Sequence, residues 1–179
     1  FGSESRGIVL SSGYACYAIS NSTPSQTSGN QINDGSGVQD PYLRQLASNS
    51  LNDSIALELK FKSKLEGVLT FDYILASREM DQSVSDPFAL FVRDCGTPES
   101  PEEHDYENIA YMPEELNDTV YGGQSNVVVE IANLQRIVNS GIPNVGDYLS
   151  LNNADGGYDA LPNMGYNVFT KPFYTKFTA

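Results

Sequence analysis

The residues best placed to do chemistry in this sequence are three carboxylates, Glu79, Asp81 and Asp86, in the segment ASREMDQSVSDPF. Apolar runs that favour β-strands lie on both sides of this segment, so the three side chains can converge at a loop. Calcium prefers about six to eight oxygen ligands, which carboxylates and backbone carbonyls supply. The segment therefore predicts a calcium site, with a solvated hairpin tip as the alternative.

A second oxygen-rich segment is LNNADGGYDAL at 151–161. Asp155 and Asp159 lie around two glycines, and we interpret both as ligand-binding candidates. The spacing differs from that of an EF-hand loop, which needs alternating oxygen ligands and a distal Glu. A Gly-rich turn held by its own Asx side chains is the alternative.

Catalysis is not expected. The run PESPEEHDYE at 98–107 surrounds His104, the single histidine, with carboxylates, but its prolines and lack of apolar residues are typical of a surface loop. A hydrolase triad needs a nucleophile with an oriented base, and neither a GxSxG elbow nor a P-loop occurs. A glycoside hydrolase that uses two carboxylates is the less favoured alternative.

The cysteines and the glycosylation sequons favour an oxidising compartment. Cys16 and Cys95 lie far apart without the spacing of a zinc site, so they form either one disulfide or two buried thiols. Acceptor triplets for N-glycosylation begin at Asn21, Asn52 and Asn117. We therefore expect the disulfide and a secreted or cell-surface location.

The charge of the chain excludes several partners. Ten Lys and Arg residues against 23 Asp and Glu give a formal net charge of −13, which repels phosphate backbones and anionic membranes. No run approaches the ~20 apolar residues that span a bilayer, and the first ten residues do not resemble a signal peptide. Nucleic acid and membrane insertion are not expected.

The elements that must position these residues are mostly strands. Period-two alternation is clearest in IALELKF, where Ile55, Leu57, Leu59 and Phe61 share one face. Only Pro41 to Ser48 reads as a short helix, with Asp40 as N-cap and Pro41 at the first position. The strands are expected at Gly7 to Leu10, Ser54 to Lys62, Gly67 to Leu75, Phe88 to Arg93, Asn108 to Met112, Ser125 to Ile131 and Tyr166 to Phe177.

This pattern predicts an all-β fold, a β-sandwich of jelly-roll type with long loops and at most one or two short helices. The length suits one domain over residues 1–179.

The order of several segments resembles the choice-of-anchor L domain family, surface-exposed β domains of large secreted proteins and adhesins. These segments are GIVLSSG at 7–13, DPYLRQL at 40–46, IALELKF at 55–61, LTFDYILASRE at 69–79, SDPFALFV at 85–92, NIAYMP at 108–113, VVVEIANLQ at 127–135, NSG at 139–141 and YNVFT at 166–170. The resemblance spans nearly the whole chain.

The resemblance implies further roles for individual residues. Its Asp-Pro motif makes Asp40 the fourth candidate calcium ligand. Where the family carries two adjacent acidic residues this chain has Arg78-Glu79, and Arg78 joins the ligand-binding candidates. Family members continue beyond the YNVFT-like strand, so a final C-terminal strand is expected to be missing or supplied by another chain.

Two functional interpretations follow. The first is an extracellular adhesion module, calcium-dependent, that binds a glycan or a peptide on another surface. The second is an assembly subunit completed by strand pairing with a partner or with another copy of itself.

Overall fold

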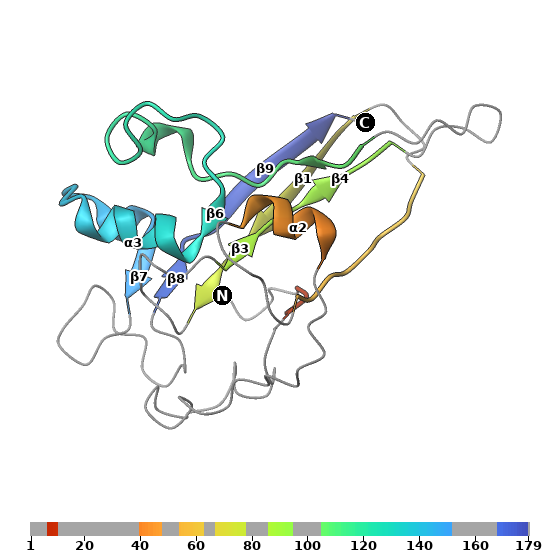
Figure 1. Cartoon of the computed structure of the whole chain (residues 1–179), viewed down its shortest axis with the longest axis horizontal. Coiled ribbons are helices and arrows are strands. Elements are labelled where there is room, and N and C mark those ends of the chain that lie inside the picture. The colour runs from red at the N-terminus through yellow and green to blue at the C-terminus, as the bar shows by residue number, and fades with distance from the viewer. Residues whose placement is uncertain are drawn as a thin grey trace, which may run out of the picture.

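The fold is all-β, as expected, with nine strands and two short α-helices among the residues that can be described (Figure 1). The computed structural model describes residues 7–10, 40–47, 54–62, 67–77, 86–94, 105–151 and 168–178. Every strand pair in these ranges is antiparallel. The jelly-roll order of strands remains a prediction.

The longest ladder joins β1 (Val68–Tyr73) to β9 (Phe173–Thr178) over six residue pairs. Alternation places Leu69, Phe71 and Tyr73 opposite Phe177, Thr175 and Phe173 on the half-buried to buried face. The other face, which carries Asp72, Tyr174 and Lys176, is exposed. One wet and one packed face is the arrangement that the period-two sequence pattern predicts.

Shorter ladders complete the structure. One sheet has the order β2 (Ala76–Ser77), β8 (Val168–Thr170) and β7 (Leu149–Leu151). β3 (Pro87–Phe88) pairs with β6 (Val129–Glu130), and β4 (Phe91–Val92) pairs with β5 (Glu107–Asn108). The strand expected over Tyr166 to Phe177 is present as β8 and β9, which are divided at Lys171 and Pro172.

The core lies between the β1–β9 ladder and the segments around β3, β5 and β6. The Tyr73 ring stacks on Phe88 with a centroid separation of 4.7 Å and meets Phe173 edge-on at 6.0 Å. Fully buried side chains from the other elements fill the centre, including Ala110, Leu116, Val129, Ile131, Leu134, Ile137, Leu149 and Val168. Burial of these aliphatic groups supplies the main driving force for folding.

Buried Asn108 joins two neighbouring segments of this core. Its Oδ1 accepts hydrogen bonds from the backbone N–H groups of Leu90 (3.2 Å) and Ala110 (3.1 Å), and its Nδ2 donates to the Ala110 carbonyl (3.0 Å). The side chain thereby satisfies backbone groups that the short β4–β5 ladder leaves free.

The helix expected at Pro41 is confirmed as α2 (Pro41–Leu46). The Asp40 carboxylate accepts from the backbone N–H groups of Tyr42 (2.9 Å) and Leu43 (2.8 Å), so Asp40 is the N-cap. Tyr42 packs against Tyr106 at 4.5 Å and Phe91 at 5.9 Å between ring centroids. These aromatic contacts hold α2 on the β4–β5 ladder.

The second helix, α3 (Ile131–Asn139), was not anticipated from the sequence. It follows β6 without a loop and buries Ile131, Leu134 and Ile137 at helical spacing. It ends before Gly141, whose positive φ of 69° is the left-handed conformation common after helices. Two 3₁₀ turns, η2 (Glu114–Leu116) and η3 (Val145–Asp147), flank this region.

Two expected strands do not form. Residues 7–10 and 54–62 pair with no other strand, and their apolar side chains are exposed. The alternation in IALELKF therefore indicates an amphipathic segment, but that segment does not contribute its apolar row to the core. Among the described residues, no helix has the length and apolar character needed to cross a membrane.

Candidate functional site

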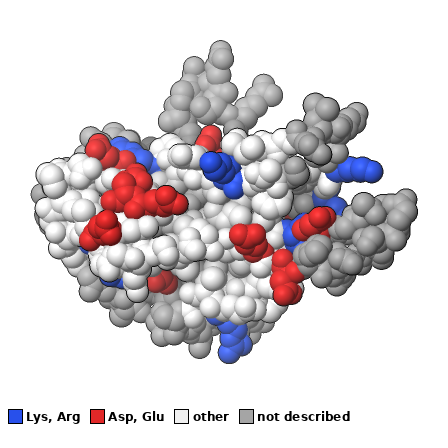
Figure 2. All heavy atoms as spheres, turned by 90° about the horizontal axis from the view of Figure 1, so that it is seen from above, with Lys and Arg blue, Asp and Glu red and all other residues white. Residues whose placement is uncertain are grey.

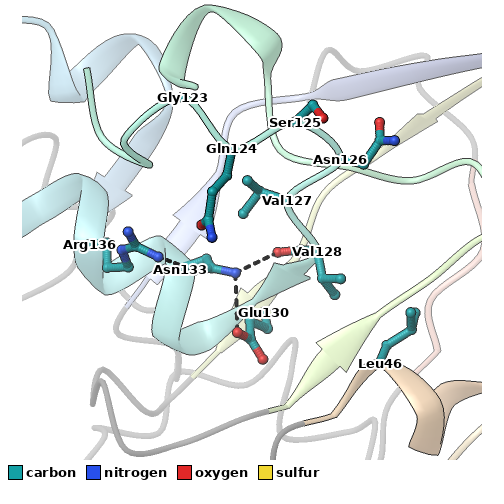
Figure 3. Close-up of a pocket in the computed structure, with 10 residues that line it drawn as sticks. All are labelled: Leu46, Gly123, Gln124, Ser125, Asn126, Val127, Val128, Glu130, Asn133 and Arg136. Carbon is teal, nitrogen blue, oxygen red and sulfur yellow. Dashed lines mark hydrogen bonds between the residues drawn. The ribbon is translucent and has the colours of Figure 1, made fainter. Parts of the chain in front are cut away.

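A polar groove lies where the loop before β6 meets the start of α3 (Figure 3). It has a volume of about 580 Å³ and opens to the surface. Leu46 of α2 stands on one side, and the loop and helix supply the rest: Gly123, Gln124, Ser125, Asn126, Val127, Val128, Glu130, Asn133 and Arg136. Most of these groups can form hydrogen bonds.

The loop owes its shape to residues in the left-handed region. Gly122 and Gly123 have φ values of 65° and 82°, which glycine adopts without steric cost, and Asn126 has a φ of 54°. The Gly123 backbone N–H donates to the Asn117 carbonyl at 2.8 Å and closes the loop after η2. Exposed Gln124 is thereby held over the groove, with its amide directed toward Asn133 (Figure 3).

Buried Asn133 organises the floor of the groove. Its Nδ2 donates to the Val128 carbonyl at 2.9 Å and to Glu130 Oε1 at 3.1 Å. Its Oδ1 accepts from Arg136 Nη1 at 3.5 Å, a long contact. One side chain therefore fixes the end of the loop, the carboxylate at the N-cap of α3 and the guanidinium one turn later.

Tyr121 contacts two residues of the groove, Asn133 and Arg136. Its ring is buried, its hydroxyl donates to the Asn133 carbonyl at 3.2 Å, and the Arg136 guanidinium lies 5.1 Å from the ring centroid. Burial raises the pKa of Tyr121 and the positive Arg136 opposes that rise only in part, so the phenol stays neutral. Because the Tyr121 ring is buried, it offers no exposed aromatic face on which a sugar could stack.

The groove combines one cation with one carboxylate on an otherwise acidic protein. Arg136 is exposed and Glu130 is half-buried. The chain carries a formal net charge of −13, and Figure 2 shows Asp and Glu side chains in two groups on the face seen from above, with Lys and Arg side chains beside and between them. This negative charge would repel a strongly anionic ligand. It would not repel a neutral ligand that carries both hydrogen-bond donors and acceptors.

Three predicted site residues fall among the described ones. Asp40 is occupied as the cap of α2. Asp86 immediately precedes β3, and although the residue is exposed as a whole, partial burial of its carboxyl raises its pKa. Asn117 is half-buried at the end of η2, and its Oδ1 has no hydrogen-bond partner within the described ranges.

Asp40 and Asp86 lie at opposite ends of the contact between α2 and the segment 87–92. Tyr42, near the start of α2, packs on Phe91, whereas Leu46 at its end lines the groove with Glu130, the partner of Pro87 in the β3–β6 ladder. α2 therefore runs against the direction of the segment 87–92. Within the described ranges, no three His, Cys, Asp or Glu side chains gather to hold a metal ion.

The remaining predicted positions lie outside the described residues, so the calcium site, the disulfide and the glycosylation sites stay predictions. These positions are Arg78, Glu79, Asp81, Asp155 and Asp159, the cysteines Cys16 and Cys95, and the sequons at Asn21 and Asn52.

The residues that sequence reasoning missed are Gln124, Asn133 and Arg136. Asn133 and Arg136 stand at i and i+3 on a helix that was not predicted, since the expected strand ended at Ile131, so their proximity was not visible. The apolar spacing Ile131, Leu134, Ile137 followed by Gly141 is the signal that would have found this helix.

Residues 2–175 match the family model described as the choice-of-anchor L domain. Comparisons with curated proteins and with solved structures found no match.

Proposed function

The chain belongs to the choice-of-anchor L domain family of surface modules, and on that basis we propose that it binds a glycan or a peptide on another surface. The observation that carries this proposal is the polar groove at the start of α3, a concave surface lined mainly by groups that can form hydrogen bonds. Ligand sites are typically concave, with a few well-placed polar groups.

The groups in the groove suit a neutral ligand. The Gln124 amide both donates and accepts, Arg136 donates, and the Glu130 carboxylate accepts. Asn133 holds Glu130 and Arg136 in place through the hydrogen bonds given above, so they lose little freedom on binding. Sugar hydroxyls and peptide amides both present donors and acceptors, which is the chemistry this set can match.

Calcium is proposed as a second component, at the loop that carries Glu79, Asp81 and Asp86; Asp40 is left out of this site, because it lies at the other end of α2 from Asp86. The raised pKa of Asp86 supports it, because a partly desolvated carboxylate gains from a nearby cation. Asp40 instead caps α2 through Oδ1. Oxygen-rich loops at one end of a β domain are suited to this role.

The test is a glycan and peptide array probed with the wild type in calcium and in chelator, followed by affinity measurements on two matched variants. Gln124→Ala removes an exposed groove amide, and binding to any array hit should fall by about tenfold or more if that amide makes a ligand hydrogen bond. Gln135→Ala removes an amide of the same type that contacts Asn139 and does not line the groove, so binding should be unchanged. Equal affinities for the two variants would place the binding site elsewhere.

Melting curves test the calcium part separately. A metal that binds only the folded protein adds about 2.7 kcal/mol when present at 100 times its Kd. The melting temperature should therefore rise in millimolar calcium, and Asp86→Asn should reduce that rise. Identical curves in calcium and in chelator would remove calcium from the proposal and leave the groove untouched.

A further inference from the structure

Residues 54–62 form an exposed amphipathic segment without a strand partner. Ile55, Leu57, Leu59 and Phe61 are 47%, 47%, 64% and 61% exposed, and Glu58, Lys60 and Lys62 alternate with them. None of these nine residues takes part in a β-bridge. In Figure 1 the yellow trace of this segment follows an extended course along the outside of the molecule.

Such a segment is incomplete in two respects. An extended backbone that pairs with no strand presents N–H and C=O groups that a second strand can satisfy. A row of four large apolar side chains in water adds a hydrophobic gain for any strand that covers it. The occupant must therefore be an extended chain with alternating apolar and polar residues.

We propose that the occupant is the same segment of a second copy of this chain, paired antiparallel about a twofold axis through Leu59. In this register Leu57 lies opposite Phe61, Leu59 lies opposite its own counterpart, and Glu58 lies opposite Lys60. The twofold axis generates each of the first and last pairs twice, as in any isologous interface. Apolar residues then share one face, and the two Glu58–Lys60 pairs lie on the other.

Charge complementarity selects this register over its neighbours. Centring the axis on residue 58 puts Glu58 opposite Glu58, and centring it on residue 60 puts Lys60 opposite Lys60. Parallel in-register pairing would also place each charge beside its like. Opposite charges stabilise cross-strand pairs, and directly opposed like charges destabilise them. Of these arrangements, only the register centred on Leu59 places apolar residues opposite apolar residues and Glu58 opposite Lys60.

The segment is also a favourable place for two acidic molecules to meet. The chain carries a net charge of −13, but residues 54–62 contain one Glu and two Lys, which gives a formal charge of +1. Two copies that meet here avoid the repulsion that most of their surfaces exert on each other. The pairing uses none of the groove residues, so it is independent of ligand binding.

Sedimentation analysis over a range of protein concentrations tests the pairing. The wild type should show a monomer–dimer equilibrium. Glu58→Lys and Lys60→Glu each create two like-charge pairs and should weaken the dimer by about tenfold. The double variant exchanges the charges and should recover the wild-type constant.

The control is Lys62→Glu, which makes the same change in net charge as Lys60→Glu but lies opposite Ala56. It should weaken the dimer less than Lys60→Glu does. All three positions are exposed, and far-UV circular dichroism should give the wild-type spectrum for each of the four variants. A wild type that stays monomeric at high concentration, or a double variant that behaves like the single ones, would overturn the proposal.

Discussion

The buried amide of Asn133 gives the most direct prediction about the groove. Replacing it by alanine removes the donor to the Val128 carbonyl (2.9 Å) and to Glu130 Oε1 (3.1 Å). A buried acceptor left without its donor costs about 1–3 kcal/mol, whereas a carboxylate that can be rehydrated costs less. Val128 and Glu130 are both half-buried and line the same groove, so the loss comes from the two acceptors together.

We therefore expect Asn133→Ala to lower the free energy of unfolding by about 2 kcal/mol. For a domain of this length that corresponds to a fall of roughly 4–8 °C in melting temperature. The matched control is Gln135→Ala on the same helix, which loses only a surface contact with Asn139 and should stay within about 0.5 kcal/mol of the wild type.

A second variant separates the hydrogen bonds from side-chain volume. Asn133→Asp keeps the shape but replaces the donor with a carboxylate beside Glu130 and the Val128 carbonyl, so at pH 7 it should destabilise more than alanine does. We expect burial and the neighbouring Glu130 carboxylate to raise the pKa of this new carboxyl in the folded state. Its penalty would then be greatest above the folded pKa, decline as the pH falls through that value, and vanish below the unfolded pKa, where both states are protonated.

Urea unfolding followed by far-UV circular dichroism at pH 7 and pH 4 measures all three variants against wild type at the same pH. If Asn133→Ala equals the control, the network does not organise the groove. An Asn133→Asp penalty that is the same at both pH values would contradict the electrostatic reasoning.

Three further predictions concern other parts of the fold. Asp40→Ala should cost about 1 kcal/mol by removing the cap of α2, whereas Asp40→Asn keeps an acceptor and should cost less; equal melting temperatures for Asp40→Ala and the wild type would contradict the capping role. Burial raises the pKa of Tyr73 to about 12, so the wild type should lose stability from about pH 10, where the unfolded phenol ionises, up to the folded pKa. Tyr73→Phe should lessen this alkaline loss in melting curves, and an unchanged pH profile would contradict it. Thiol labelling of the denatured, unreduced protein should find neither Cys16 nor Cys95 free, and labelling at both would disprove the predicted disulfide.

Local signals in the sequence predicted the elements that depend on local physics. The Asp-Pro pair fixed the start of α2, because an N-cap and a first-turn proline act within one turn. Alternation predicted β1 and β9 because each has one packed and one wet face. The apolar run before α3 concealed the change from strand to helix, since β6 passes into the helix at Ile131 without a turn residue.

The groove could not be predicted because it depends on residues whose partners are distant in sequence or are backbone atoms. Leu46 belongs to a helix about eighty positions before the loop that it faces, and period and spacing carry no information about such contacts. The principal bond of Asn133 is to a carbonyl, which every residue has. Nothing in the sequence marks Val128 as the one that needs a donor.

The segment 54–62 also shows that a local pattern does not predict which partner covers it. Alternation correctly identifies one apolar row, yet period alone cannot say whether the chain's own core, a ligand or another molecule covers it. In the structure the core closes without it, because Tyr73, Phe88 and Phe173 pack together and leave Leu59 and Phe61 in water. In this segment Glu58 and Lys60 alternate with the exposed apolar residues, and a pattern with both charge signs on one face favours antiparallel pairing with a copy of itself. The exchange of Glu58 and Lys60 tests this pairing directly.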